Sequence, residues 1–334
     1  MPYYHMPDGE QLFVRRYGQG EPVLVLSGLG IQSWQWHPFL YPHHKKFEFI
    51  IPDWRGFGGS KQCKIPHLDA ISSHWRDIEA LLPQLNLPQF KVIAYSMGAT
   101  TAMHGMQYGQ FHRSIQQYLH IDQTPKISAD QSWPFGLFGE KHTQFIEILQ
   151  QISQVLKANP DAKAMPDLKS ADRQRLLNSW LAFIDLQAGS KDAKAMPDLK
   201  SADRQRLLNS WLAFIDLQAG SKIAPFLIKQ ALKYPRLQAH VLPIQRLDYL
   251  SWYIHNYLEH QEDYREALTQ LTCPVTFFIG AESKLYPAEG QQQIANTIPQ
   301  AQQVIFKKSG HTPLLSEPLK FASEIGRFLH AHDA

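Results

Sequence analysis

Ser96 follows a short apolar stretch and precedes a run of small residues, in the sequence VIAYSMGA. This pattern predicts a buried strand over 91–95 that turns sharply into a helix over 97–108. On such a turn a serine hydroxyl stands clear of the sheet, and the helix N-terminus favours developing negative charge. The turn needs small residues two positions before and after the serine, and Ala94 and Gly98 meet this need. Ser96 is therefore the candidate nucleophile; an ordinary turn with an incidental serine is the alternative interpretation.

His311 is the candidate general base. It lies in a loop directly after the last predicted strand, 302–306, where an imidazole could accept the proton of Ser96. The chain has 16 histidines, and any one of them is more often a surface or structural residue. The position of His311 in the chain order nucleophile, acid, base is what distinguishes it from the others.

Two carboxylates are candidates for the acid that orients His311. Asp122 ends a predicted strand over 114–122, and Glu282 lies in the loop after a predicted strand over 274–280. A strand end holds a carboxylate more rigidly than a loop does, so we favour Asp122 and keep Glu282 as the alternative acid. Each residue also has a structural interpretation, Asp122 as a turn cap and Glu282 as a solvated loop charge.

A glycine-containing loop, SGLG, follows a predicted strand over 22–27. Backbone N–H groups of such a loop can point into a site, so we expect the N–H groups of Leu29 and Met97 to form an oxyanion hole. The competing interpretation is a dinucleotide-binding loop with Asp53 at the end of the next strand, which would indicate a nicotinamide oxidoreductase. We disfavour it because Ser33 replaces the third glycine and two strands precede the loop.

Aromatic residues make up 12% of the chain, which favours an aromatic-rich core or pocket. Four of them lie in or near the segments named above and are candidates to line an apolar substrate pocket, although each can equally be a core residue: Trp34, Trp36, Tyr95 and Trp133.

The composition excludes several classes of protein. With 44% hydrophobic and 19% charged residues, the chain is too apolar to be disordered. A net charge of +3 with only short basic pairs does not indicate a nucleic-acid surface. Two cysteines and no metal-ligand spacing predict no disulfide framework, no metal and no cofactor. No apolar run approaches the roughly 20 residues of a membrane helix, and the N-terminus lacks a signal-peptide pattern. We therefore expect a cytoplasmic enzyme that acts on a small molecule.

Strands and helices alternate along both ends of the chain. Helices are expected over 68–85, 97–108, 288–298 and 318–330, and strands over 11–17, 22–27, 47–53, 91–95, 114–122, 274–280 and 302–306. This alternation predicts an α/β fold with a mostly parallel sheet. The segment 126–265 shows helical patterns and no clear strand, so we expect a helical cap inserted into a core formed by 1–125 and 266–334.

A perfect tandem duplication lies inside this helical segment. Residues 161–191 and 192–222 are identical, 31 residues each. Two perfect copies indicate a late duplication rather than a solenoid, which needs more numerous and diverged repeats. Each copy has one apolar helical face, formed by Leu176, Leu177, Trp180, Leu181 and Ile184 and repeated at Leu207, Leu208, Trp211, Leu212 and Ile215. One copy is expected to pack in the ancestral place, and the second face would need a partner, a homo-oligomer contact or an enlarged lid.

Taken together, the motifs resemble those of the α/β-hydrolase superfamily, in particular serine carboxylesterases and cofactor-free haloperoxidase-like hydrolases. The resemblance covers roughly 10–125 and 270–330 and rests on SGLG, DWRGFGGS, AYSMG and GH, in this order. It implies a central sheet with flanking helices and a cap after the strand that ends at Asp122. In this family an aspartate usually lies three residues after the glycine of the penultimate core strand, where this chain has Ser283 after Gly280; some branches place the acid at the position of Asp122 instead.

The leading hypothesis is a serine hydrolase that cleaves a small carboxylic ester through an acyl-enzyme. Haloalkane dehalogenases and epoxide hydrolases are disfavoured, since these relatives have an aspartate in place of Ser96. Serine chemistry on a lactone, amide or carbon–carbon bond stays open. A binding or signalling protein with little turnover is the hypothesis from a different class.

Overall fold

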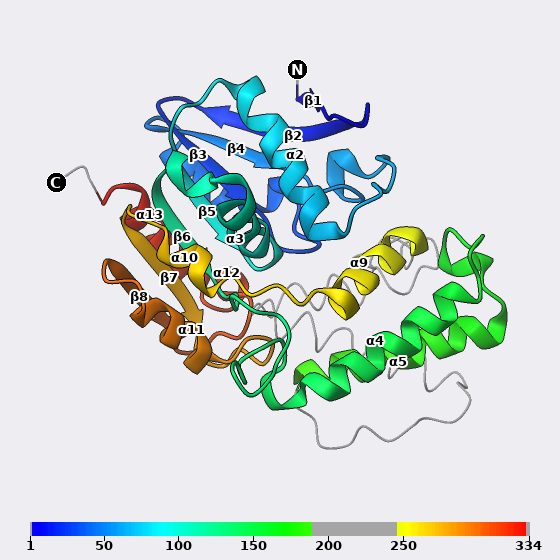
Figure 1. Ribbon diagram of the computed structural model, residues 1–334. Helices are drawn as coiled ribbons and strands as arrows, with labels where there is room; N and C mark the ends of the chain where they lie inside the picture. Colours follow the sequence, from blue (N-terminus) through cyan, green and yellow to red (C-terminus); the bar gives the residue numbers. More distant parts are fainter. Residues whose placement is uncertain (1, 189–245, 332–334) are drawn as a thin grey trace.

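The computed structural model describes residues 2–188 and 246–331. Its centre is an eight-stranded sheet with the strand order β1-β2-β4-β3-β5-β6-β7-β8 (Figure 1). The strands are β1 (Tyr3–His5), β2 (Gln11–Gly18), β3 (Glu21–Leu26), β4 (Phe47–Pro52), β5 (Phe90–Tyr95), β6 (Ile115–Ile121), β7 (Val275–Gly280) and β8 (Ala301–Phe306).

The sheet is parallel from β4 through β3 to β8, while β2 pairs antiparallel with β4 and β1 antiparallel with β2. The predicted α/β fold with a mostly parallel sheet is therefore confirmed, and each predicted strand lies within one or two residues of an observed strand. Strand β1 was not predicted. β2 and β3 follow each other in the sequence but are separated in the sheet by β4.

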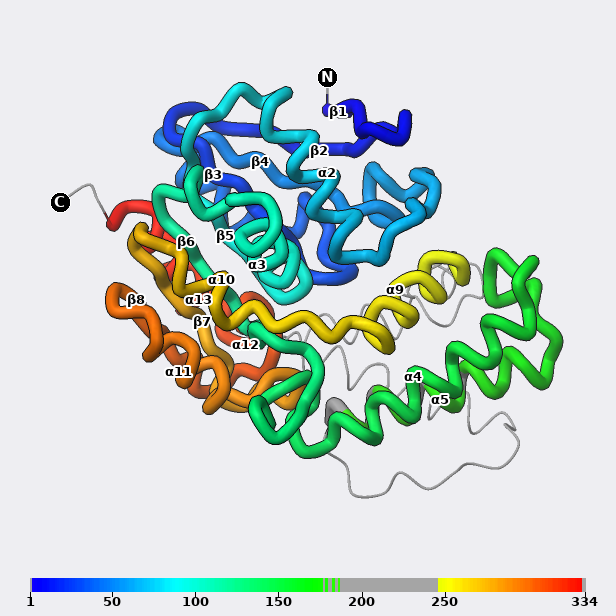
Figure 2. Tube along the Cα trace, in the orientation of Figure 1, coloured from blue at the N-terminus to red at the C-terminus, as the bar shows by residue number. Residues whose placement is uncertain are grey.

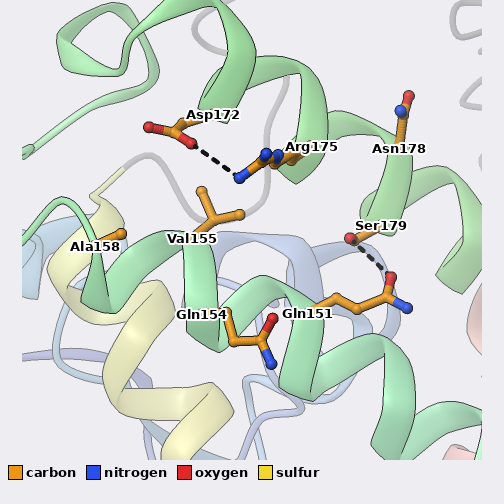
Figure 3. A pocket seen from close by; sticks show the side chains of 8 residues that line it. All are labelled: Gln151, Gln154, Val155, Ala158, Asp172, Arg175, Asn178 and Ser179. Atoms are coloured by element: carbon orange, nitrogen blue, oxygen red, sulfur yellow. Dashed lines mark hydrogen bonds and ion pairs between the residues drawn. The ribbon is translucent and has the colours of Figure 1, made fainter.

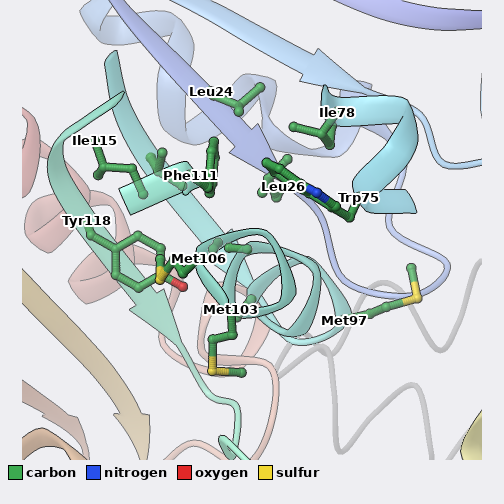
Figure 4. Packing of buried hydrophobic residues seen from close by; sticks show 14 of the residues in the cluster. Leu24, Leu26, Trp75, Ile78, Met97, Met103, Met106, Phe111, Ile115 and Tyr118 are labelled. Atoms are coloured by element: carbon green, nitrogen blue, oxygen red, sulfur yellow. The ribbon is translucent and has the colours of Figure 1, made fainter. Parts of the chain in front are cut away.

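Helices cover both faces of the sheet, as the alternation of side chains along each strand requires. On one face α2 (Ala70–Leu85), α3 (Met97–Gly109), α10 (Arg265–Thr269) and α11 (Ala288–Asn296) pack on alternate residues of the central strands. Figure 4 shows this packing where α2 and α3 meet β3 and β6, through residues such as Trp75, Met103, Leu24 and Tyr118. On the other face lie α1 (His37–Leu40) and α13 (Pro318–Leu329), which bury the intervening strand residues.

Among the described residues, three longer helices between β6 and β7 form a separate layer. They are α4 (His142–Lys157), α5 (Ser170–Ala188) and α9 (Leu247–Glu259), and they lie together beside the lower right of the sheet in Figures 1 and 2. Many of their apolar side chains form a cluster that includes Leu149, Ile152, Leu176 and Ile254, while Tyr249 and Tyr253 of α9 belong to the core beneath the sheet helices. The short helix α12 (Pro313–Ser316) follows β8 in the core.

The first copy of the duplication contains α5, whose Leu176 is buried against α4 as the predicted apolar face requires. The side chains of the other four residues of that face are outside the described part of the structure. The whole second copy, 192–222, also lies outside the described residues.

Candidate active site

Ser96 lies at the sharp turn between β5 and α3. Its backbone has φ 52° and ψ −123°, a combination that non-glycine residues rarely adopt and that is found at functional turns. Hydrogen bonds hold this strained conformation: Ser96 N–H donates to the Ile121 carbonyl, and the Ser96 carbonyl accepts from Ala99 and Thr100. The hydroxyl is thereby fixed at the carboxyl end of the sheet, and the side chain is 7% exposed.

Glycine is required at two positions near this turn because the backbone segments approach closely. A Cβ on Gly98 would lie 2.1 Å from the Leu26 carbonyl oxygen, so only glycine lets α3 begin against the end of β3. A Cβ on Gly28 would lie 2.9 Å from the Tyr95 ring and 3.1 Å from Ser96 Cβ. The loop after β3 therefore lies directly against the serine.

The structure brings Ser96, His311 and Asp122 into one hydrogen-bonded chain. His311 Nε2 lies 2.9 Å from Ser96 Oγ, and His311 Nδ1 lies 2.6 Å from Asp122 Oδ2. The three residues follow β5, β8 and β6 respectively, so they meet at the same edge of the parallel sheet. This arrangement has the geometry of a nucleophile, a general base and an orienting acid.

Asp122 is completely buried and is surrounded by hydrogen-bond donors. Its Oδ1 accepts from the Gly280 N–H and from Gln291 Nε2, both at 3.0 Å. Its Oδ2 accepts from Ser283 Oγ at 2.8 Å and from His311. A carboxylate with this many donors is held in one orientation. Glu282, the alternative acid, is exposed, so the structure does not bring its carboxylate to His311.

Ser283 and Gln291 were missed by sequence reasoning. Ser283 was noted only as a residue that cannot replace an aspartate, yet its hydroxyl supports the carboxylate that does bind His311. Gln291 is 0% exposed on α11, far from Asp122 in the sequence. No motif distinguishes it from other glutamines, because its importance comes from the packing of α11 on the end of β7.

Ser283 occupies a position from which a carboxylate could replace Asp122. We expect Asp122→Asn to be nearly inactive and the double variant Asp122→Asn, Ser283→Asp to recover at least tenfold in kcat. The reason is that Ser283 Oγ lies 2.8 Å from the oxygen that binds His311, so a carboxylate at 283 can reach Nδ1.

Ester hydrolysis by the single and double variants measures this recovery, with Asp122→Asn, Glu282→Asp as the matched control. Equal rates for the double variant and Asp122→Asn alone would contradict the account.

The loop after β3 is held by two residues that follow β4. The Asp53 carboxylate accepts from Ser33 N–H at 2.6 Å and from Gly59 N–H at 2.9 Å. Trp54 Nε1 donates to the Ser27 carbonyl at 2.7 Å. Asp53 therefore has a structural role here, in place of the ribose contact that a dinucleotide site would need.

Met97 is the first residue of α3, so its N–H has no acceptor within the helix. Leu29 lies in the loop that Gly28 brings against Ser96. For neither N–H does the described part of the chain provide a recorded hydrogen-bond acceptor. The oxyanion hole formed by these two N–H groups stays a prediction.

The four aromatic candidates have different surroundings. Tyr95 stacks on the His311 ring at a centroid distance of 5.3 Å, and its hydroxyl donates to the His311 carbonyl, so it fixes the position of His311. Trp36 is completely buried and donates to Ser27 Oγ, and Trp133 is 1% exposed and donates to Thr124 Oγ1. Both indoles are thus buried and held by hydrogen bonds, and their place on a pocket wall stays a prediction. Trp34 is 57% exposed.

Two other buried histidines are structural and uncharged. Burial lowers the pKa of His74 to about 3 and that of His120 to about 4. His74 contacts the hydroxyl of Tyr253, and His120 contacts the Tyr118 hydroxyl and the Gln123 carbonyl. Desolvation keeps both imidazoles neutral at ordinary pH, in agreement with the expectation that most histidines here do no chemistry.

A separate pocket of about 380 Å³ lies between α4 and α5 (Figure 3). Polar side chains in its walls include Gln151 and Gln154 on α4 and Arg175 and Ser179 on α5. None of the candidate site residues lines it. No cluster of three histidine, cysteine or acidic residues in the described ranges could hold a metal ion, and no described helix is long and apolar enough to cross a membrane.

Comparisons with known proteins place this geometry in context. The sequence profile of the Alpha/beta hydrolase family matches residues 23–324. The pimeloyl-[acyl-carrier protein] methyl ester esterase of Nitrosomonas europaea is 23% identical over 314 residues, which cover 93% of this chain and 97% of that protein.

Solved structures resemble the fold over nearly its whole length. An esterase from Exiguobacterium antarcticum matches with a TM-score of 0.65 and 16% identity, covering 98% of both chains. A bromoperoxidase from Bacillus anthracis matches with a TM-score of 0.62 and 16% identity, covering 96% of this chain and 95% of that one.

Proposed function

This chain belongs to the alpha/beta hydrolase family, and we propose that it is a serine esterase that cleaves small carboxylic esters through an acyl-enzyme. The observation that carries the proposal is the hydrogen-bonded chain from Ser96 Oγ through His311 to the buried Asp122, with distances of 2.9 and 2.6 Å. We also propose the division into a core, 1–125 and 266–334, and a helical cap, 126–265.

In the acylation step Ser96 Oγ attacks the ester carbonyl while His311 Nε2 takes its proton. Asp122 accepts the Nδ1–H, which holds the imidazole in the required tautomer and stabilises the imidazolium that forms. The N–H groups of Leu29 and Met97 bind the oxygen of the tetrahedral intermediate. His311 then gives its proton to the leaving alcohol, and the acyl group stays on Oγ.

In deacylation a water molecule repeats these steps. His311 takes a proton from the water as it attacks the acyl carbon, and it returns a proton to Ser96 Oγ as the C–Oγ bond breaks. The carboxylic acid is released and the free serine is restored. Neither step requires a metal or a cofactor.

The methyl ester esterase from Nitrosomonas europaea spans almost the whole of this chain. Its name suggests a substrate with a small alcohol part and a long acyl part. We therefore include methyl esters of medium-length acyl chains, free or on an acyl-carrier protein, among the substrates proposed here. Small lactones are a second proposed class of substrates, since they contain the same ester carbonyl group.

A panel of esters tests the proposal. We expect hydrolysis of p-nitrophenyl and methyl esters with acyl chains from two to ten carbons, with kcat/KM changing with acyl length. Ser96→Ala serves as the control for spontaneous hydrolysis. A binding protein without turnover would show the same rates for the wild type and Ser96→Ala across the whole panel, and this outcome would reject the esterase.

A further inference from the structure

The two oxygens of the Asp122 carboxylate have different partners. Oδ2 binds His311 Nδ1 and Ser283 Oγ. Oδ1 accepts hydrogen bonds from Gly280 N–H and Gln291 Nε2. A carboxylate can rotate about its Cβ–Cγ bond, and such a rotation would turn Oδ2 away from the imidazole. The donors to Oδ1 therefore help to decide whether Oδ2 faces His311.

The two donors to Oδ1 differ in kind. Gly280 N–H is a backbone group at the end of β7, whereas Gln291 Nε2 belongs to a side chain of α11. The same nitrogen of Gln291 also donates to the Tyr286 carbonyl at 3.0 Å. Since an amide nitrogen carries two hydrogens, both of its donors are used, one on the acid and one on the β7–α11 loop.

The other end of the Gln291 amide is unpaired. The residue is 0% exposed, and no group in the described part of the chain donates to its Oε1. The reverse orientation of the amide would put Oε1 against two acceptors, Asp122 Oδ1 and the Tyr286 carbonyl, so the amide cannot improve its pairing by turning over. An unpaired buried acceptor lowers stability. Keeping a donor on Asp122 under this condition is a pattern found at functional sites.

We propose that Gln291 is a positioning residue, whose amide holds the Asp122 carboxylate with Oδ2 toward His311 during catalysis. This proposal rests on the proposed esterase function. The amide is neutral, so it orients the carboxylate without a positive charge that would compete with the imidazolium. The negative charge of the carboxylate then acts on the imidazolium that forms when His311 takes the proton of Ser96.

Gln291→Met removes the donor and keeps an unbranched side chain of similar length. We expect kcat per active site to fall about tenfold to a hundredfold, the range of a hydrogen bond to a charged group. KM should stay within about twofold, because Gln291 acts through Asp122 and not on the substrate. Active sites are counted by fluorophosphonate labelling carried to completion, so that a loss of folded protein is not mistaken for a loss of catalysis.

Gln293→Met is the matched control, because it makes the same change at an exposed position of the same helix. It should leave kcat and KM as they are in the wild type.

Gln291→Glu gives a second readout, which a merely structural role would not change. A carboxyl group at 291 would lie beside Asp122, and two carboxyl groups in one site hold a shared proton more tightly than either alone. While that proton is present, it can serve as the donor to Oδ1. As the pH rises, the proton is lost, and the repulsion between two carboxylates turns Asp122 away from His311. The kcat of this variant should therefore fall with rising pH.

A pH–rate profile on one ester from about pH 6 to pH 10 measures this fall. The wild type and Gln293→Glu should keep their activity in the alkaline range where Gln291→Glu loses it. The contacts given above connect position 291 with three titratable residues, Asp122, His311 and Tyr286. Burial raises the pKa of the Tyr286 phenol well above its usual value, so this group does not titrate in the measured range.

A wild-type kcat per active site in Gln291→Met would overturn the proposal. A wild-type pH profile in Gln291→Glu would also overturn it, and this result decides the question if Gln291→Met does not fold. A wild type that neither hydrolyses esters nor reacts with the fluorophosphonate would instead reject the esterase function itself.

Discussion

Ser96→Ala should lower the kcat of ester hydrolysis by about 10⁶-fold, as loss of the nucleophile does in a well-studied serine hydrolase. In the proposed mechanism this residue supplies the oxygen that forms the acyl bond, and no other described hydroxyl lies within hydrogen-bond distance of His311 Nε2. His311→Ala should have an effect of the same size, because the serine and its base act as a unit.

The fold should survive both changes. Alanine removes one oxygen from Ser96, while the backbone hydrogen bonds that hold the turn remain. Circular dichroism and a thermal melt check this, and Ser72→Ala, on the partly exposed side of α2, is a control for a serine outside the site. Near-normal turnover in Ser96→Ala would show that the serine mechanism is wrong.

Asp122→Asn should lower kcat by about 10⁴-fold, the size of the effect in the best-studied triad. Four groups donate hydrogen bonds to the native Asp122 carboxylate: Gly280 N–H, Gln291 Nε2, Ser283 Oγ and His311 Nδ1. In the variant, the amide NH₂ of the asparagine must lie among these donors. The NH₂ therefore faces a donor or forces His311 into the wrong tautomer.

Glu282→Gln is the comparison for Asp122→Asn, and it should change kcat less than twofold because the Glu282 side chain is exposed. Steady-state kinetics on one good ester rank the two variants. A larger loss of kcat in Glu282→Gln would identify Glu282 as the acid. Small losses in both variants would show that neither carboxylate orients His311.

The central part of the fold could be predicted because its strands are short apolar runs with clear ends. The strand over 91–95 and the helix over 97–108 match β5 and α3, and the sharp turn at Ser96 follows from the small residues around it. Strand β1 was missed because three residues at the sheet edge, two of them partly or fully exposed tyrosines, carry no burial pattern.

The residues around the acid could not be predicted in the same way. Gln291 contacts Asp122 and Tyr286 contacts His311 through the packing of α11 and the β7–α11 loop, which no local sequence pattern predicts. Trp36 and Trp133 were candidates for a pocket wall because sequence alone does not separate a core indole from a pocket indole. In the structure both indoles are buried, and their Nε1 groups donate hydrogen bonds to Ser27 and Thr124.

The most direct test of the central claim is to locate the covalent adduct of a fluorophosphonate probe by peptide mass spectrometry. An activated serine reacts with such a probe, whereas ordinary serine hydroxyls do not. The account predicts one adduct per chain, on the peptide that contains Ser96, with labelling lost in Ser96→Ala and strongly slowed in His311→Ala and Asp122→Asn. An unlabelled wild type, or an adduct on another residue that persists in Ser96→Ala, would contradict it.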